Sequence, residues 1–216
     1  MDSATEAELA RLRMVRDQLQ ARGGIRDRRV LEAMSRVPRE RFVAVANPAD
    51  AYADRALSIE CGQTISQPII VALMTEALRL TGDETVLDVG TGSGYQAAVL
   101  AQLARRVISI EVHPELSAQA SRVLSELGYK NIELVVGDGR RGWPAAAPYE
   151  GIVVAAATDR CPAALTEQLA EQGVLVIPIG GPAGQVLERI ERRGERLIRT
   201  SLTGCRFVPL VEGAEG

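Results

Sequence analysis

The chain has 216 residues, of which 46% are hydrophobic and 25% charged, and its formal net charge is −3. This balance is typical of a soluble globular domain with a sizeable core, and the slight negative charge argues against a nucleic-acid partner held by bulk electrostatics. Three distant cysteines without a C-x-x-C pair exclude a disulfide framework and favour a reducing compartment. We find no signal peptide and no apolar run approaching the ~20 residues of a membrane span, and therefore expect a cytoplasmic protein away from membranes.

The first 80 residues are expected to be mainly helical. Residues 5–22 are predicted to form an amphipathic helix, because apolar residues recur at helical spacing: Leu9, Leu12, Val15 and Leu19. Further helices are predicted over 27–36, ended near Pro38, and over 68–80, with Pro68 in the first turn. The segment between these two helices, 47–67, is expected to be a loop.

From residue 85 the pattern alternates between apolar strands and helices. Strands are predicted over 85–89, 106–111, 132–137, 151–157 and 173–180, and helices over 95–104, 114–127 and 162–171. A hairpin turning at Arg193–Gly194 and a last strand over 205–211 follow. The expected fold class is therefore α/β: a doubly wound, mostly parallel sheet with an N-terminal helical extension and a C-terminal antiparallel hairpin, in a single domain over 1–216.

The stretch VLDVGTGSGYQ, residues 86–96, places Gly90, Gly92 and Gly94 between a predicted strand and a helix. Glycines there let the backbone approach a ligand with no Cβ in the way, although a tight turn without a ligand requires the same residues. A dinucleotide site favours G-x-G-x-x-G, and Tyr95 puts the third glycine out of that register. The chain has no Gly-Lys-Ser/Thr, which excludes a phosphate-binding P-loop.

Acidic residues stand at the tips of the next two strands. Glu111 can accept hydrogen bonds from both ribose hydroxyls of an adenosine, in nicotinamide and S-adenosylmethionine sites alike. Asp138, between two glycines, can accept from the adenine amino group. Because ligands of such folds bind at the carboxyl edge of the sheet, these signals favour S-adenosylmethionine, which carries no phosphate and needs no basic residue in the loop.

Five segments in this order resemble the protein-L-isoaspartate O-methyltransferases, a family of class I methyltransferases. They are the GI-to-VPRE-x-F stretch (24–42), GQTISQP (62–68), VLDVGTGSGYQ (86–96), GDG followed by GW (137–143) and RFVPL (206–210). The resemblance covers nearly the whole chain. The segment GQTISQP makes it specific, since this segment is not a generic methyltransferase element.

The resemblance implies methyl transfer from S-adenosylmethionine to the free α-carboxylate of L-isoaspartyl residues in aged proteins and peptides, followed by spontaneous closure to a succinimide. It maps the active-site serine onto Ser66, with residues 1–80 on the substrate side and 81–216 as the cofactor-binding core. No metal is implied, and we expect a monomer. The implied cofactor-binding residues are Thr64, Ile65, Gly90, Gly92, Ser93, Gly94, Glu111, Asp138 and Gly139.

Two departures from the family pattern occur. Glu150–Gly151 stands where the family often has Asp, and Thr158–Asp159–Arg160 replaces the proline that usually follows the fourth strand. The second departure puts the peptide preference in doubt. Spacing alone predicts that Ser66 is the N-cap of the helix that begins near Pro68. A substrate carboxylate is ionised at neutral pH and needs no general base, so His113, the only histidine, is expected to be structural or at the cofactor's edge.

Three other functions remain open. A related carboxyl methyltransferase acting on aspartate of a specific peptide product is weakened by the absence of an added domain. A non-catalytic S-adenosylmethionine- or nucleotide-binding module is disfavoured by Ser66 in its full motif. A nicotinamide oxidoreductase is disfavoured by Tyr95 and Asp138.

Overall fold

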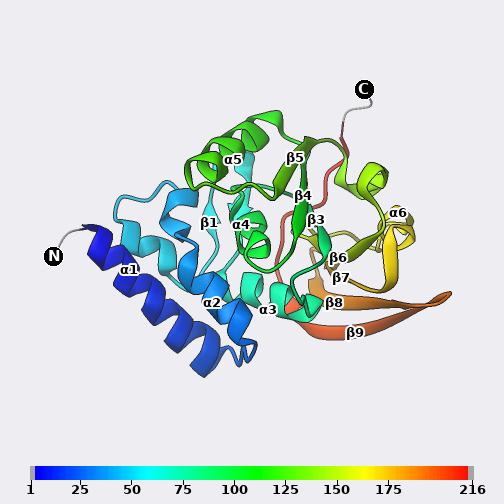
Figure 1. Cartoon of the computed structure of the whole chain (residues 1–216), viewed down its shortest axis with the longest axis horizontal. Coiled ribbons are helices and arrows are strands. Elements are labelled where there is room, and N and C mark those ends of the chain that lie inside the picture. Colours follow the sequence, from blue (N-terminus) through cyan, green and yellow to red (C-terminus); the bar gives the residue numbers. More distant parts are fainter. Residues whose placement is uncertain (1–2, 214–216) are drawn as a thin grey trace.

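The centre of the computed structural model, which describes residues 3–213, is a seven-stranded sheet in the order β5-β4-β3-β6-β7-β8-β9 (Figure 1). The first five of these strands run parallel, and β8 and β9 join antiparallel. The α/β class and the hairpin at Arg193–Gly194 are thereby confirmed. The strands are β3 (Thr85–Val89), β4 (Arg106–Glu111), β5 (Ile132–Val136), β6 (Tyr149–Val154), β7 (Leu169–Gly181), β8 (Gly184–Arg193) and β9 (Arg196–Cys205).

Helices cover the two faces of the sheet unequally. Successive strand residues point to opposite faces, so Val86 belongs to one buried cluster and Leu87 to the other. The first cluster is shared with α3 (Pro68–Leu78), α4 (Tyr95–Ala101) and α5 (Pro114–Glu126). The second is shared with the short α6 (Ala163–Glu167) and the 3-10 turn Pro144–Ala146; a further 3-10 turn spans Gly139–Arg141.

The N-terminal helix departs from the predicted periodicity. An α-helical part, α1 (Ser3–Arg13), continues into a π-helix, Met14–Arg22, whose turns are wider. Met14 and Leu19, five residues apart, are both fully buried, whereas Leu9 and Leu12 are 39% and 49% exposed. The predicted stripe is confirmed in part: Leu19 is buried and Val15 packs against the core. It is wrong for Leu9 and Leu12, which lie in the α-helical part, where Ala7 faces the core instead.

Some predicted boundaries also moved. Helix α2 (Arg28–Arg36) begins as expected, with the Asp27 carboxylate accepting the Arg29 N–H at 2.8 Å. The loop 47–67 contains a small antiparallel pair, β1 (Leu57–Ser58) with β2 (Thr64–Ile65). Helix α6 ends at Glu167 because Leu169 already pairs with Tyr149 of β6.

The predicted last strand over 205–211 is wrong. Strand β9 ends at Cys205, and the chain beyond it makes one isolated bridge, between Pro209 and Ala157. The Ala157 N–H donates to the Val208 carbonyl at 2.8 Å and the Leu210 N–H donates to the Ala157 carbonyl at 2.7 Å, so the pairing is limited to this bridge. Segment 206–213 instead crosses the carboxyl edge of the sheet.

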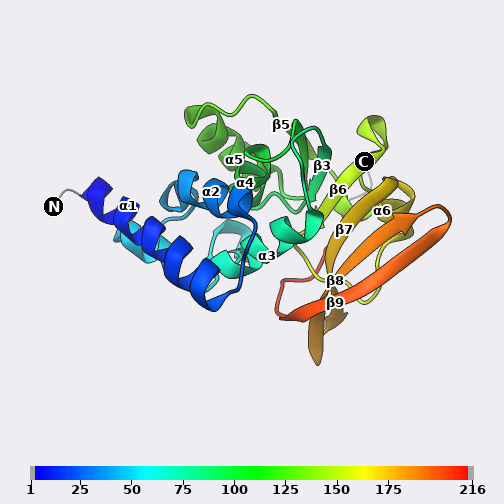
Figure 2. The same cartoon turned by 60° about the horizontal axis from the view of Figure 1, so that its bottom comes forward.

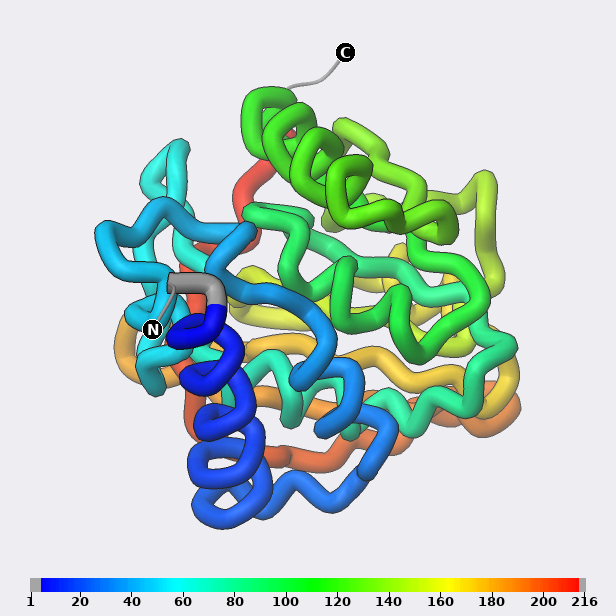
Figure 3. Tube along the Cα trace, turned by 60° about the vertical axis from the view of Figure 1, so that its left-hand side comes forward, coloured from blue at the N-terminus to red at the C-terminus, as the bar shows by residue number. Residues whose placement is uncertain are grey.

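The two ends of the described chain lie in different parts of the molecule. The N-terminal helices and the β8–β9 hairpin lie at opposite ends of the molecule (Figure 2). Figure 3 shows the C-terminal segment, in red, on the same side as residues 50–66, in cyan. In the part of the chain that the structure describes, 3–213, no helix has the length and apolar character needed to span a bilayer.

Candidate active site

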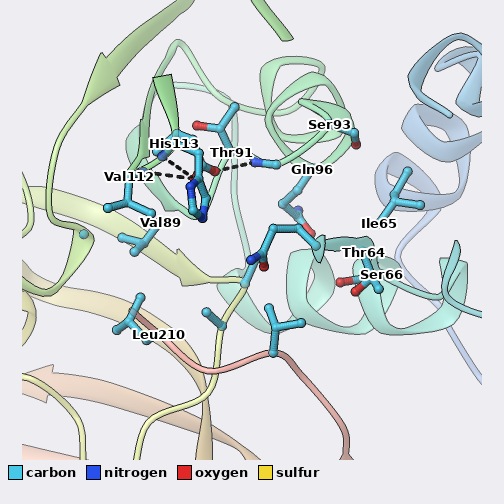
Figure 4. Close-up of a pocket in the computed structure, with 18 of the residues that line it drawn as sticks. Thr64, Ile65, Ser66, Val89, Thr91, Ser93, Gln96, Val112, His113 and Leu210 are labelled. Carbon is cyan, nitrogen blue, oxygen red and sulfur yellow. Dashed lines mark hydrogen bonds between the residues drawn. The ribbon is translucent and has the colours of Figure 1, made fainter. Parts of the chain in front are cut away.

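A cavity opens at the carboxyl ends of β3, β4 and β6 (Figure 4). We call its lining residues 89–93, 95, 96 and 110–113 the glycine-loop wall, and residues 63–66 the serine wall. In Figure 4, Thr64, Ile65 and Ser66 lie across the cavity from Val112 and His113. Residues 208–211 form a third wall, and the remaining lining residues are Val71, Gly139, Ala155 and Ala156. Among all the lining residues Glu111 is the one carboxylate, and no lysine or arginine is present.

The glycine loop requires its glycines. Gly90, Gly92 and Gly94 have φ values of 92°, 51° and 90°, the left-handed region that side chains disfavour. The Gly90 N–H donates to the Ile110 carbonyl at 2.8 Å, which fixes the loop to the end of β4. Because no Cβ intervenes, backbone forms this part of the cavity surface, as predicted from the sequence.

Glu111 is held in a single position by backbone donors. Its side chain is buried. One carboxylate oxygen accepts the Gly92 N–H at 2.8 Å, and the other accepts the N–H groups of Val112 and His113, both at 3.0 Å. A carboxylate has about four lone-pair positions, so capacity remains for hydroxyl donors from the cavity. The residue thus fits the vicinal hydroxyls of a ribose.

A buried acid beneath the loop was missed by the sequence analysis. Asp88 is fully buried, and one of its oxygens accepts from the Ser109 hydroxyl at 2.7 Å, while the other has no partner. Ser109 in turn shares a hydrogen bond with Thr91 at 2.6 Å. Burial raises the pKa of Asp88 to about 7. The hydrogen bond from Ser109 lowers this pKa in part, and the negative charge of Glu111 raises it by a smaller amount. The signal was available: a lone acid in an apolar strand directly before the glycines.

Asp138 does not line the cavity, although the neighbouring Gly139 does. The Asp138 carboxylate accepts the backbone N–H of Arg140 at 2.9 Å and pairs with the Arg140 guanidinium at 2.8 Å, which holds the pKa of Asp138 below its usual range. Arg140 also pairs with Glu212 of the C-terminal segment. A Cβ on Gly139 would lie 2.4 Å from a methyl group of Val89, so only glycine fits there.

Ser66, Thr64 and Ile65 all line the cavity, as do Ser93, Gly90 and Gly92. Gly94 does not line it, and a Cβ there would meet Ala120 and Leu124 of α5. The N-cap interpretation of Ser66 is wrong: Gln67 occupies the N-cap of α3, and that cap has no side-chain hydrogen bond. The C-terminal wall, 208–211, was not predicted as part of the site. The RFVPL motif was the one feature of the sequence that pointed to this segment, and its residue types and spacing indicate no chemical role.

Comparisons with known proteins agree on one family. A family model described as protein-L-isoaspartate(D-aspartate) O-methyltransferase matches residues 11–215. Protein-L-isoaspartate O-methyltransferase 1 of Syntrophobacter fumaroxidans is 54% identical over 202 residues, 94% of each chain. The Koribacter versatilis protein-L-isoaspartate O-methyltransferase is 52% identical, over 94% of this chain and 91% of its own.

Solved structures extend the likeness to the fold. A protein-L-isoaspartate O-methyltransferase matches with a TM-score of 0.79 and 30% identity; the match covers 86% of this chain and 62% of that longer one. A Plasmodium falciparum protein-L-isoaspartate O-methyltransferase in complex with S-adenosyl-L-homocysteine matches with a TM-score of 0.80 and 25% identity, over 94% and 99% of the two chains.

Proposed function

Because the chain belongs to the protein-L-isoaspartate O-methyltransferase family, we propose that its cavity holds S-adenosylmethionine against the glycine-loop wall and an isoaspartyl residue near the serine wall. The enzyme transfers a methyl group from S-adenosylmethionine to the free α-carboxylate of L-isoaspartyl residues in damaged proteins and peptides. The methyl ester then closes to a succinimide, and its hydrolysis returns part of the damage to normal aspartate.

The observation that supports this use of the cavity most strongly is its charge. One carboxylate held by backbone N–H groups, Glu111, lies in a lining without lysine or arginine. S-adenosylmethionine supplies a methyl group bonded to a positively charged sulfur and has no phosphate. A lining of this kind suits such a cation, whereas a nucleotide's phosphates would be matched better by lysine or arginine, which the lining lacks.

We assign the cofactor contacts accordingly. Glu111 accepts from the ribose hydroxyls, and Gly90, Gly92, Ser93 and Gly94 lie along the remainder of the cofactor. Thr64 and Ile65 border it from the serine wall. Gly139 lets the chain approach the adenine. Asp138 accepts from the adenine amino group, a role for which its carboxylate must share itself between the base and Arg140. Apart from Thr64 and Ile65, the proposed cofactor-binding residues belong to residues 81–216, and residues 1–80 form the substrate side.

Ser66 is proposed to orient the substrate. The nucleophile is a carboxylate whose ordinary pKa is near 4, so it is already ionised at neutral pH and no general base is required. When carboxylate and sulfonium approach, two opposite charges are neutralised, and a weakly polar site favours that transition state over the separated ions. The Ser66 hydroxyl can donate a hydrogen bond to one oxygen of the substrate carboxylate. An ion pair with lysine or arginine would instead stabilise the charged substrate more than the transition state. Alignment of this kind can contribute roughly 7 to 11 kcal/mol.

The second cavity is proposed to receive residues that flank the isoaspartate. It is lined by Thr158, Asp159 and Arg206, and it shares Pro209 and Leu210 with the first. Since Thr158–Asp159–Arg160 departs from the family pattern, peptide preference should differ here. We further propose that the enzyme acts as a monomer, without nucleic acid, in the cytoplasm, where its three free cysteines would stay reduced.

A paired-peptide assay tests the activity. Two peptides that differ only in aspartate against isoaspartate are incubated with enzyme and methyl-labelled S-adenosylmethionine. Base-labile label is expected on the isoaspartyl peptide alone. Label on the aspartyl peptide would favour another carboxyl methyltransferase, and cofactor binding with label on neither would favour a binding module.

The variant Ser66→Ala tests the proposed residue. Loss of one oriented hydrogen bond should lower kcat about 10- to 100-fold, with cofactor affinity within about twofold. Ser35→Ala serves as the control, since Ser35 bonds only within α2 and lies outside the cavity. An unchanged kcat for Ser66→Ala would remove this serine from the mechanism.

A further inference from the structure

Arg39 is a fully buried cation. It lies in the 3-10 turn Arg39–Phe42 with no solvent exposure. Among the described residues, 3–213, no carboxylate lies within ion-pair distance of it. A buried guanidinium without a counter-ion costs several kcal/mol, and the Arg39 Nη1 has no hydrogen-bond partner among the described residues. A purely packing role would therefore favour an apolar side chain at this position.

The contacts of Arg39 join the serine wall to the glycine-loop wall. Its Nη2 donates to the Ser66 carbonyl at 2.8 Å, and its Nε donates to the Ala51 carbonyl at 2.8 Å. Its guanidinium carbon lies 4.9 Å from the ring centre of Tyr95, a cation–π distance. Tyr95 follows Gly94 directly and lines the cavity. One side chain therefore contacts both the residue proposed to orient the substrate and the loop proposed to hold the cofactor.

Ser66 has little local structure to fix it. It follows a two-residue strand, β2, and precedes α3, whose first hydrogen bonds, from Ile70 and Val71, go to the Gln67 carbonyl rather than to Ser66. The Ser66 carbonyl is therefore left without a helical donor, and Arg39, 27 residues earlier in the chain, supplies one. The position of the serine depends on this long-range bond.

We propose that Arg39 is a positioning residue for methyl transfer: it holds Ser66 at a fixed place relative to Tyr95 and the glycine loop. The inference rests on the proposed role of Ser66. Geometry, rather than charge alone, is what Arg39 supplies, because the planar guanidinium donates to two separate carbonyls while it stacks on a ring. A lysine keeps the charge and has one compact ammonium group, which cannot reproduce that arrangement.

A double-mutant cycle tests the proposal. Wild type, Arg39→Lys, Ser66→Ala and the double variant are compared for kcat and KM on the isoaspartyl peptide and for cofactor affinity. Arg39→Lys should lower kcat about tenfold and leave cofactor affinity within about threefold. In the Ser66→Ala background, the same change should lower kcat less than about twofold, because the hydroxyl that Arg39 positions is already gone.

A matched control separates positioning from the general cost of altering a buried arginine. Arg189 is also buried and donates to a helix carbonyl, that of Ala77, at 2.9 Å, far from the cavity lining. Arg189→Lys should keep kcat within about twofold. If Arg39→Lys does not fold, the cycle is repeated with Arg39→Gln, and failure of both variants to fold would overturn the proposal in favour of a structural role.

The outcomes distinguish the two proposals. Equal losses of kcat from Arg39→Lys in both backgrounds would show that Arg39 acts independently of Ser66 and would overturn this inference alone. No loss from Ser66→Ala would instead overturn the proposed role of the serine. A coupled loss of kcat with cofactor affinity retained supports both.

Discussion

The two main walls of the cavity are fixed over very different distances in sequence. In the glycine-loop wall, Glu111 is bound by the N–H groups of its two following residues and by Gly92, 19 residues away on the adjoining strand unit. In the serine wall, the Ser66 carbonyl depends on Arg39, which lies in a separate turn outside the sheet. The first wall is therefore built from two strands that are adjacent in sequence, β3 and β4, with the loops that follow them. The second wall forms only when segments distant in sequence pack together.

The largest effect should come from Glu111→Gln, which breaks the glycine-loop wall alone. An amide at this place loses charge and turns an NH2 group toward backbone donors, so the loop and the ribose contacts both suffer. Loss of hydrogen bonds to a charged group costs about 1.5 to 3 kcal/mol each, and cofactor affinity should fall by about 100-fold or more. Isothermal titration with S-adenosylmethionine measures it.

Glu133→Gln is the control for that change, since Glu133 forms a half-exposed ion pair with Arg106 outside the cavity. Its cofactor affinity should be unaltered. If Glu111→Gln bound the cofactor as tightly as wild type does, the assignment of Glu111 to the ribose would be wrong. The proposal that the glycine-loop wall binds the cofactor would then lose its main support.

An intermediate effect, on the unfolding free energy, is expected from Asp88→Asn, which alters the buried hydrogen bonds beneath the glycine-loop wall. Because burial raises the pKa of Asp88 to about 7, the folded protein binds a proton here more tightly than the unfolded chain does. This group's contribution to the unfolding free energy is therefore greatest below the unfolded pKa and declines as pH rises to about 7. Between pH 5 and pH 8 the loss should be on the order of 2 kcal/mol.

Urea unfolding of the cofactor-free protein at both pH values measures this loss. Asp88→Asn cannot titrate, so its unfolding free energy should change less between pH 5 and pH 8 than that of wild type. The exposed Asp50→Asn serves as the control and should follow wild type. An identical pH dependence for Asp88→Asn and wild type would contradict a raised pKa at this site.

The smallest effect should come from Asp138→Asn, at the margin of the glycine-loop wall. If Asp138 accepts from the adenine amino group, cofactor affinity should fall about tenfold, and an analogue with a keto oxygen in place of that amino group should lose nothing further. Glu212→Gln, which removes only the second partner of Arg140, should stay within about twofold. An equal effect of the two variants would limit Asp138 to holding the C-terminal segment.

The contrast between the walls also explains which features the sequence could predict. The parallel sheet, the glycine loop and the place of Glu111 at the end of β4 follow from local periodicity and from residues at strand ends, and the structure confirms them. The role of Glu111 toward a ribose stays a prediction. Thr64, Ile65 and Ser66 were identified only through resemblance to a family, because nothing near them in sequence specifies their position. Arg39 was passed over, since an arginine beside Glu40 and Arg41 reads as part of an exposed charged run.

Other misses have similar physical causes. The buried face of the N-terminal helix was predicted only in part: Leu19 is buried as predicted, whereas Ala7 and Met14 face the core in place of Leu9 and Leu12. The last strand was overpredicted because Val208 and Leu210 have the alternation of a strand, although the segment makes only one isolated bridge, between Pro209 and Ala157. Such features depend on hydrogen bonds made across the molecule, which single-sequence periodicity does not encode.

The crossing of segment 206–213 over the sheet edge has a consequence for synthesis. Since residues 208–211 form one wall of the cavity, the cavity cannot be complete before the chain has been synthesised through residue 211. A ligand that binds only the finished site cannot stabilise a shorter nascent chain, because stabilisation by binding requires the native site. Fusions placed directly after residue 211 should therefore disturb ligand capture more than fusions at the opposite terminus.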